Sequence, residues 1–281
     1  MKTLLLLAAF SGALLAQEPF QVKVTGHGQP MLLIPGLASG ADTWDTTIAH
    51  YKDRYECHAF TMAGFVGVPR VPGPLLDRYR DGIADYIRKH NLVKPVIVGH
   101  SLGGSLALEI GIKYPDLPGK LIIVDSYPFL FGAFTPGATP ESARQSVAAM
   151  RQGMGQMTDE MWANYTKSGA STRMMVTKDS DFQRLVAWGL ASDRTAVTDS
   201  MCDLFASDLR DDVARIKVPT LVLLTSDTAR DQYAKLAGVE IKVTTTARHF
   251  IMWDDPEWMF SQTDPFLAAR TSAPRVPVSA K

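Results

Sequence analysis

Residues 96–106 read VIVGHSLGGSL, an apolar run that leads directly into a serine surrounded by glycines. An ordinary turn from strand to helix needs one glycine at most, so Gly99, Gly103 and Gly104 around Ser101 indicate an unusual steric demand on the backbone. The residues before the serine are typical of a buried strand, and those after it, SLALEIGIKY, are typical of a helix. We therefore predict a sharp strand-to-helix turn with Ser101 at its tip.

Short runs with strand character recur on both sides of this turn. They are FQVKVTG (20–26), PMLLIPG (30–36), YECHAFTM (55–62), PVIVGH (95–100), KLIIVDS (120–126), VPTLVLLTS (218–226) and EIKVTTTA (240–247). Helix-compatible stretches separate several of them, and in residues 75–92 the apolar positions follow a helical period. Apolar strands that alternate with amphipathic helices are typical of a mostly parallel sheet covered on both faces, so the sequence predicts an α/β fold.

The alternation stops after Asp125 and returns at residue 218. The stretch between opens with a linker rich in proline and glycine, PFLFGAFTPGATP, and continues as several helical segments without a convincing strand. We predict a core of residues 17–126 and 214–270, interrupted by a helical cap over residues 127–213. Residues 271–281 lack a core pattern and are predicted to form a flexible tail.

The N-terminal stretch MKTLLLLAAFSGALLAQ has the pattern of a secretory signal peptide. A lysine precedes a short apolar run, and small residues follow where cleavage would occur. We expect residues 1–16 to be removed and the protein to be secreted or periplasmic, in a bacterium. The run is too short to span a bilayer comfortably, so no stable membrane insertion is expected after cleavage.

The composition narrows the class of partner. The 281 residues include 29 basic and 29 acidic side chains, so the formal net charge is zero and does not indicate binding to nucleic acid or to an anionic membrane. We expect a small-molecule substrate; the oligomeric state stays open. The chain has no H-E-x-x-H, C-x-x-C or P-loop motif, so no metal or other cofactor is implied. Cys57 and Cys202 could form one disulfide, but two separate buried thiols are favoured.

The five residues from Gly99 to Gly103 fit the G-x-S-x-G pattern of a nucleophile elbow, with the strand and helix that such an elbow requires. Side chains at Gly99 and Gly103 would collide with neighbouring backbone. His100 is expected to pack or hydrogen-bond beside the serine. Ser101 would then stand at a helix N-terminus, where backbone N–H groups favour developing negative charge.

A serine hydroxyl needs a base before it can act as a nucleophile. Four histidines precede the elbow and His100 belongs to it, which leaves His249, in the loop after the last strand, as the predicted base rather than a structural surface residue. A carboxylate must orient this base. Asp227, at the end of a strand, is favoured; Asp125 and Asp231 remain alternatives.

Two backbone donors are predicted for an oxyanion. The N–H of Leu102, the residue after the serine, is one. The N–H of Leu37 is the other, because Pro35 and Gly36 allow a tight turn after an early strand. A type II turn without any function would use the same two residues.

These motifs resemble those of the α/β-hydrolase family over nearly the whole mature chain. LLIPGL is similar to the family's oxyanion loop, MAGFVGVP to the loop after the next strand, GHSLGG to the elbow, and RHFIMWDDPE to the histidine loop. The resemblance implies a mostly parallel sheet of about eight strands with an antiparallel second strand, and a triad of Ser101, Asp227 and His249. The glycines that often precede the family's acid and histidine are absent here.

The residues and the resemblance together predict a carboxylesterase-like serine hydrolase that cleaves a small, apolar ester through an acyl-enzyme. An amidase, a lactonase or a C–C hydrolase with the same triad is the alternative, as is a non-catalytic binding protein of the same fold. Methionines concentrate in the predicted cap and would either line an apolar lid or form packing stripes of the helices. They are Met150, Met154, Met157, Met161, Met174, Met175 and Met201.

Overall fold

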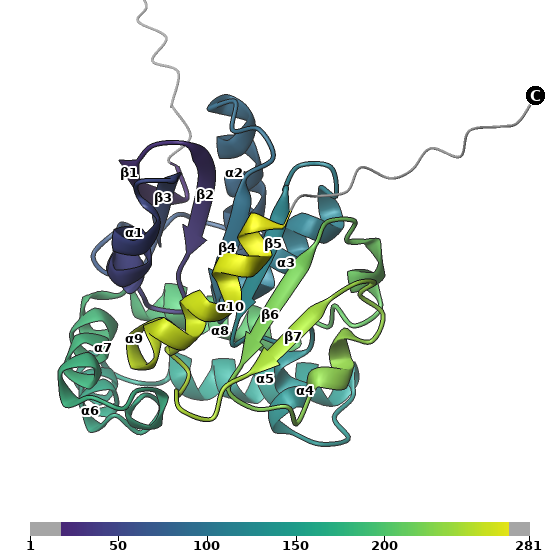
Figure 1. Ribbon diagram of the computed structural model, residues 1–281. Helices are drawn as coiled ribbons and strands as arrows, with labels where there is room; N and C mark the ends of the chain where they lie inside the picture. The colour runs from purple at the N-terminus through teal and green to yellow at the C-terminus, as the bar shows by residue number, and fades with distance from the viewer. Residues whose placement is uncertain (1–17, 270–281) are drawn as a thin grey trace, which may run out of the picture.

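The computed structural model describes residues 18–269, which form one seven-stranded sheet with helices on both faces (Figure 1). The strand order is β1-β3-β2-β4-β5-β6-β7, in which β1 runs antiparallel to β3 and all other neighbours are parallel. The strands are β1 (Phe20–Gly26), β2 (Gln29–Ile34), β3 (Tyr55–Met62), β4 (Val96–His100), β5 (Lys120–Val124), β6 (Thr220–Leu224) and β7 (Glu240–Val243). The predicted α/β fold is confirmed.

The strand count differs from the expected eight. The described residues contain seven strands, and the antiparallel strand is the first of them rather than the second. The direction of β1 follows from its connection to β2. A tight turn makes these two strands run in opposite directions, and since β2 is parallel to β3, which lies between them in the sheet, β1 is antiparallel to β3. The predicted signal peptide (1–16) and tail (271–281) lie outside the described residues.

The apolar strands serve two cores at once, because successive side chains point to opposite faces of a sheet. In β2, Leu32 and Ile34 belong to one buried cluster, whereas Met31 and Leu33 belong to another. The same alternation holds along β4, β5 and β6. A continuous apolar run is therefore what a strand covered on both faces requires.

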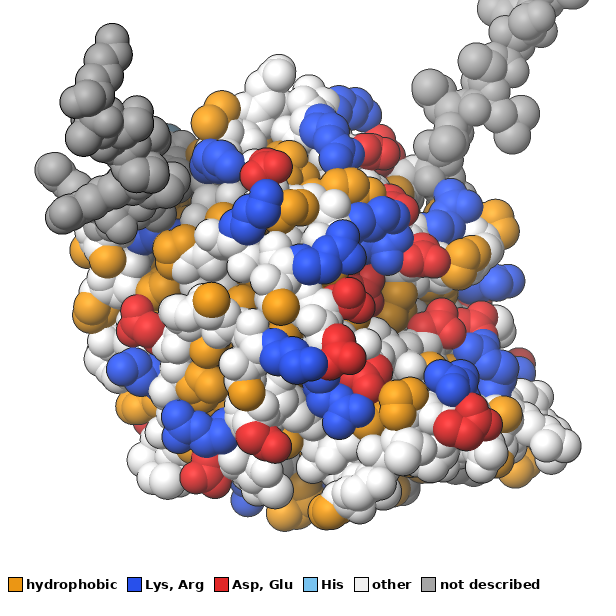
Figure 2. All heavy atoms as spheres, turned by 90° about the vertical axis from the view of Figure 1, so that its right-hand side faces the viewer, with side chains coloured by type: hydrophobic (Ala, Val, Ile, Leu, Met, Phe, Trp, Pro, Cys, Tyr) orange, Lys and Arg blue, Asp and Glu red, His pale blue; other side chains and the backbone are white. Residues whose placement is uncertain are grey.

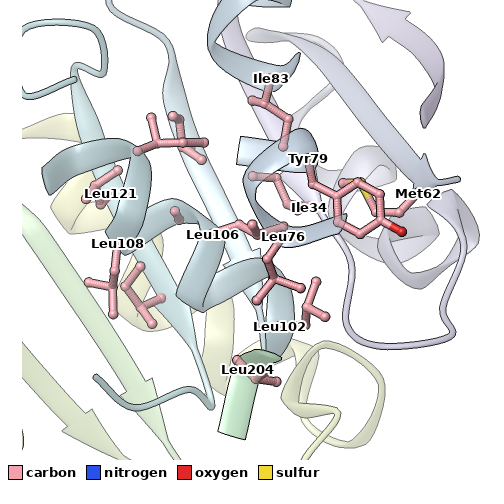
Figure 3. Close-up of a cluster of buried hydrophobic side chains, with 14 of the residues drawn as sticks. Ile34, Met62, Leu76, Tyr79, Ile83, Leu102, Leu106, Leu108, Leu121 and Leu204 are labelled. Atoms are coloured by element: carbon pink, nitrogen blue, oxygen red, sulfur yellow. The ribbon is translucent and has the colours of Figure 1, made fainter. Parts of the chain in front are cut away.

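Helices cover each face of the sheet. The helices α2 (Leu75–Lys89) and α3 (Leu102–Lys113) lie on one side, and α1 (Asp45–Tyr51), α9 (Ile251–Asp254) and α10 (Pro256–Ala268) lie on the other (Figure 1). Figure 3 shows the first of these cores, where side chains from β2, β3, α2, α3 and β5 meet. Leu204, from the segment between β5 and β6, reaches the same cluster.

A helical insertion, defined here as residues 130–206, follows β5 and precedes β6. It consists of α4 (Leu130–Phe134), α5 (Pro140–Gly155), α6 (Asp159–Ser168), the 3-10 helix η2 (Arg173–Met175), α7 (Asp179–Ala191) and α8 (Arg194–Ala206). Local capping residues set several of these ends. Thr139, Thr158 and Asp193 accept backbone N–H groups at helix N-termini, and Gly169 ends α6 in the left-handed conformation.

Charged side chains of both signs share the surface, and the two cysteines lie apart. Figure 2 shows basic and acidic side chains interspersed on one face rather than gathered by sign. None of the helices within residues 18–269 is both long and apolar enough to cross a membrane. Cys57 and Cys202 are both buried and unpaired, as the sequence favoured.

Candidate active site

Ser101 lies at the tip of a strained turn between β4 and α3. Its φ of 52° and ψ of −118° are rarely adopted by a residue with a side chain, and such a conformation costs about 1–3 kcal/mol. The flanking glycines make the turn possible. A Cβ at Gly99 would lie 2.1 Å from the carbonyl oxygen of Gly103, and one at Gly103 would lie 2.2 Å from that of Ile34. The predicted elbow and its steric reason are both present in the structure.

His249 contacts the carboxylate of Asp125. Its Nδ1 lies 2.6 Å from Oδ2 of Asp125, and Asp125 is buried whereas His249 is partly exposed. Asp125 follows β5 directly. Because Val124 pairs with His100 across the sheet, Asp125 is level with Ser101 at the carboxyl ends of adjacent strands.

Thr225, the first residue after β6, fixes the other oxygen of this carboxylate. Its backbone N–H and its hydroxyl both donate to Oδ1 of Asp125, each at 2.9 Å. Burial raises the pKa of the Asp125 carboxyl, but the hydrogen bond and charge of His249 and the two bonds from Thr225 outweigh burial and hold the pKa below its ordinary value. Asp125 is therefore an ionised acceptor for the Nδ1–H of His249 at neutral pH.

This geometry contradicts the preference for Asp227 as the acid and favours its alternative, Asp125. Asp227 and Asp231 are exposed in the loop after β6, and His249 accepts or donates no side-chain hydrogen bond to either within the described residues. Thr225 was not among the predicted site residues; its place immediately after a strand that neighbours β5 was the available signal.

His100 supports the histidine loop from inside the elbow. It is fully buried, its Nε2–H donates to the carbonyl oxygen of His249 at 2.9 Å, and its ring centroid lies 4.5 Å from that of His249. Burial lowers the pKa of His100 well below its ordinary value, and the charge of His249 lowers it further. His100 is thus a neutral donor, and this contact, together with Asp125, brings the loop after β7 to the serine.

The two backbone N–H groups predicted as oxyanion donors have no hydrogen-bond acceptor among the described residues. Within residues 18–269, neither the N–H of Leu37 nor that of Leu102 donates a hydrogen bond. Leu102 begins α3, where unpaired N–H groups and the helix dipole favour an anion. The loop that carries Leu37 passes close to the serine, because a Cβ at Gly36 would lie 3.3 Å from the Cβ of Ser101.

The methionines of the insertion have no common role. Met154 is buried in the packing of α5, whereas Met161 and Met174 are largely exposed, at 54% and 76%. The remaining four are partly buried. Packing therefore accounts for Met154, and the exposed pair contributes to neither a helix core nor an enclosed lining.

The chain belongs to the alpha/beta hydrolase family, whose sequence profile matches residues 31–262. The resemblance seen in the motifs is therefore confirmed. A human protein, "(Lyso)-N-acylphosphatidylethanolamine lipase", is 30% identical over 105 residues, which is 36% of this chain and 31% of the human protein. The match thus spans about a third of the length of that curated relative.

Solved structures share the fold over most of the chain. The enol-lactonase from Burkholderia xenovorans LB400 has a TM-score of 0.75 at 13% identity and covers 89% of this chain and 96% of its own. An esterase from Exiguobacterium antarcticum has a TM-score of 0.74 at 18% identity, with the same coverage of both chains. At these identities the likeness concerns the fold alone.

Proposed function

We propose that this member of the alpha/beta hydrolase family is a serine hydrolase that cleaves small, apolar esters through an acyl-enzyme. The observation that carries the proposal is the 2.6 Å contact between His249 and the buried Asp125, whose neighbour Val124 accepts the N–H of Ser101 at 2.9 Å. An ionised carboxylate can only accept, so Nδ1 of His249 carries the proton and Nε2 keeps a free electron pair. That tautomer is the one a general base needs.

In the first half of the reaction, Oγ of Ser101 attacks the ester carbonyl carbon while Nε2 of His249 takes the hydroxyl proton. The carbonyl π electrons move onto oxygen, and the N–H groups of Leu37 and Leu102 stabilise that oxyanion. The oxyanion then reforms the carbonyl and the bond to the alcohol oxygen breaks. His249 gives its proton to this oxygen, so the alcohol leaves and the acyl group stays on Ser101.

The second half repeats these steps with water. His249 removes a proton from water as the water oxygen attacks the acyl carbon, and the same N–H groups hold the oxyanion. Collapse breaks the bond to Ser101 Oγ, which recovers its proton from His249. Asp125 remains ionised throughout and stabilises the imidazolium that forms twice in each cycle.

An apolar substrate is favoured by the residues that surround the site. Phe250 follows His249 directly and is buried, and the loop with Leu37 packs against the apolar cluster on the α3 side. No charged side chain other than Asp125 contacts His249 through a side-chain hydrogen bond within the described residues. An uncharged acyl or alcohol group of modest size fits these surroundings better than an ionic one.

Covalent labelling tests the proposal. Purified protein is incubated with a fluorophosphonate probe beside Ser101→Ala, His249→Ala and Asp125→Asn variants, with Asp227→Asn as the matched control. We expect labelling of the wild type and of Asp227→Asn, none of Ser101→Ala, and strongly slowed labelling of the other two. A folded wild-type protein that does not label would refute the hydrolase proposal and favour a binding function.

The location is part of the same proposal. The charged start, short apolar run and small residues of the N-terminal stretch support export to the periplasm or beyond. Expression of the full chain in a bacterium, followed by fractionation and mass spectrometry of the N-terminus, tests it. A protein that stays in the cytoplasm with residues 1–16 intact would contradict export.

A further inference from the structure

The helical insertion is attached to the loop that carries His249. At the last residue of η2, the carbonyl of Met175 accepts the N–H of Phe250 at 3.3 Å. The carbonyl of Val176 accepts a guanidinium N–H of Arg248 at 2.7 Å. These bonds hold the residues on both sides of His249, so this part of the insertion and the histidine loop form one unit.

Asp254, at the end of α9, joins the same two segments through its carboxylate. Oδ1 accepts both the backbone N–H of Thr177, at 3.0 Å, and its hydroxyl, at 2.5 Å. Oδ2 accepts the backbone N–H of Arg248, the residue before His249, at 2.9 Å. One side chain therefore bonds the insertion with one oxygen and the histidine loop with the other.

Apolar packing supports this connection from below. Val176 is fully buried in the cluster that contains Phe250 and Trp253. Trp253, adjacent to Asp254, stacks on Phe250 with ring centroids 4.4 Å apart and lies 5.6 Å from Trp188 of α7. Because Trp253, the residue before Asp254, packs against both Phe250 and Trp188, the Asp254 carboxylate has little freedom to follow Thr177 or Arg248 alone.

We infer that Asp254 is a positioning residue that couples the insertion, through Thr177, to the backbone of His249. This inference rests on the proposed role of His249 as the base. The insertion cannot lift at residues 175–177 without breaking its bonds to Asp254, Arg248 and Phe250, so any opening must occur in other parts of the insertion, and displacement at Thr177 would lower the rate of the chemical step.

A hydroxyl-specific pair of variants tests the coupling. Thr177→Val removes one bond to Asp254 and keeps the shape of the side chain, whereas Thr177→Ser keeps the hydroxyl. Loss of one hydrogen bond to a carboxylate predicts up to about a tenfold fall in kcat. We expect Thr177→Val to show that fall with KM for a short-chain ester little changed, and Thr177→Ser to restore the wild-type kcat.

Asp254→Asn is the stronger variant. Its amide oxygen can still accept from Thr177, which turns the amide N–H₂ toward the N–H of Arg248, so that two donors face each other. We expect kcat to fall by about 10- to 100-fold. Thr195→Val, a like change at an exposed threonine of α8, is the control and should leave kcat unchanged.

Hydrogen exchange in a Ser101→Ala background separates this inference from the proposed function. If the coupling exists, Thr177→Val must speed amide exchange in residues 248–254 as well as around residue 177, whether or not the wild-type protein is a hydrolase. A wild-type protein that fails to label with a fluorophosphonate would contradict the proposed function and leave the coupling through Asp254 intact. Wild-type kcat and unchanged exchange at residues 248–254 in both Thr177→Val and Asp254→Asn would overturn the inference.

Discussion

Replacing Asp125 by asparagine tests the assignment of the acid, and the structure predicts how the new side chain will sit. Thr225 presents two donors to Oδ1, its N–H and its hydroxyl. The amide oxygen of the asparagine must take that place, because an N–H₂ group there would face the N–H of Thr225. The N–H₂ group then points to Nδ1 of His249 and donates to it.

Such a donor forces the opposite tautomer on His249. Nδ1 becomes the acceptor, the proton moves to Nε2, and Nε2 can no longer take the proton of Ser101. In serine proteases the same exchange of tautomer lowers kcat by about 10⁴-fold. We therefore expect Asp125→Asn to lose about 10³- to 10⁴-fold in kcat, equivalent to about 4–5.5 kcal/mol of transition-state stabilisation.

Steady-state hydrolysis of 4-nitrophenyl acetate or butyrate measures this loss, with Asp227→Asn as the matched control. KM should change little, since Asp125 is buried behind His249 and does not reach the substrate. Thermal unfolding of both variants checks that they are folded. An Asp125→Asn enzyme within tenfold of wild type, or a larger loss in Asp227→Asn, would refute the argument.

Three further predictions follow from packing and charge. Gly103→Ala should destabilise the protein by about 3 kcal/mol or more, since its Cβ would overlap the backbone of β2. Gly153→Ala, with open space around it in α5, should instead stabilise the protein by about 0.5–1 kcal/mol. Urea unfolding of both variants measures these changes in the free energy of unfolding. Burial raises the pKa of Asp81, but bonds from Arg80, Lys113 and Tyr114 lower it overall, so its stabilisation is present above pH ~3.9 and is lost as the pH falls through the lower folded pKa. Asp81→Asn should cost about 0.5–1 kcal/mol at pH 7, after screening at this partly exposed site, and make the loss of stability below pH ~4 shallower in denaturation curves. Excess dithiothreitol should leave Tm unchanged, because Cys57 and Cys202 are unpaired; a fall would show a disulfide.

The fold followed from the sequence because its signals are local. Strands covered on both faces must be apolar throughout, and helices must be amphipathic or apolar. The pattern of residues along the chain therefore indicated the order of the strands and helices, and their ends to within a few residues. The elbow was equally readable. Gly99 is required by a clash with Gly103 inside the turn itself, and the strand and helix on either side are short-range features, whereas the clash at Gly103 is with the distant backbone of Ile34.

Only the tertiary structure decided which carboxylate meets His249. Asp125, Asp227 and Asp231 all follow strands, and no local property separates them. The choice depends on the pairing of Val124 with His100 and on the bonds from Thr225 to Asp125, which are contacts between segments more than twenty residues apart.

The coupling through Asp254 is of the same kind. Thr177 and Arg248 lie on different segments, and the three hydrogen bonds that meet at one carboxylate exist only once the insertion has packed on the histidine loop. The sequence by itself determined the sheet, the elbow and the candidate base, because neighbouring residues impose their geometry. The acid and its supports came from folding, because distant residues meet only when the chain has closed around them.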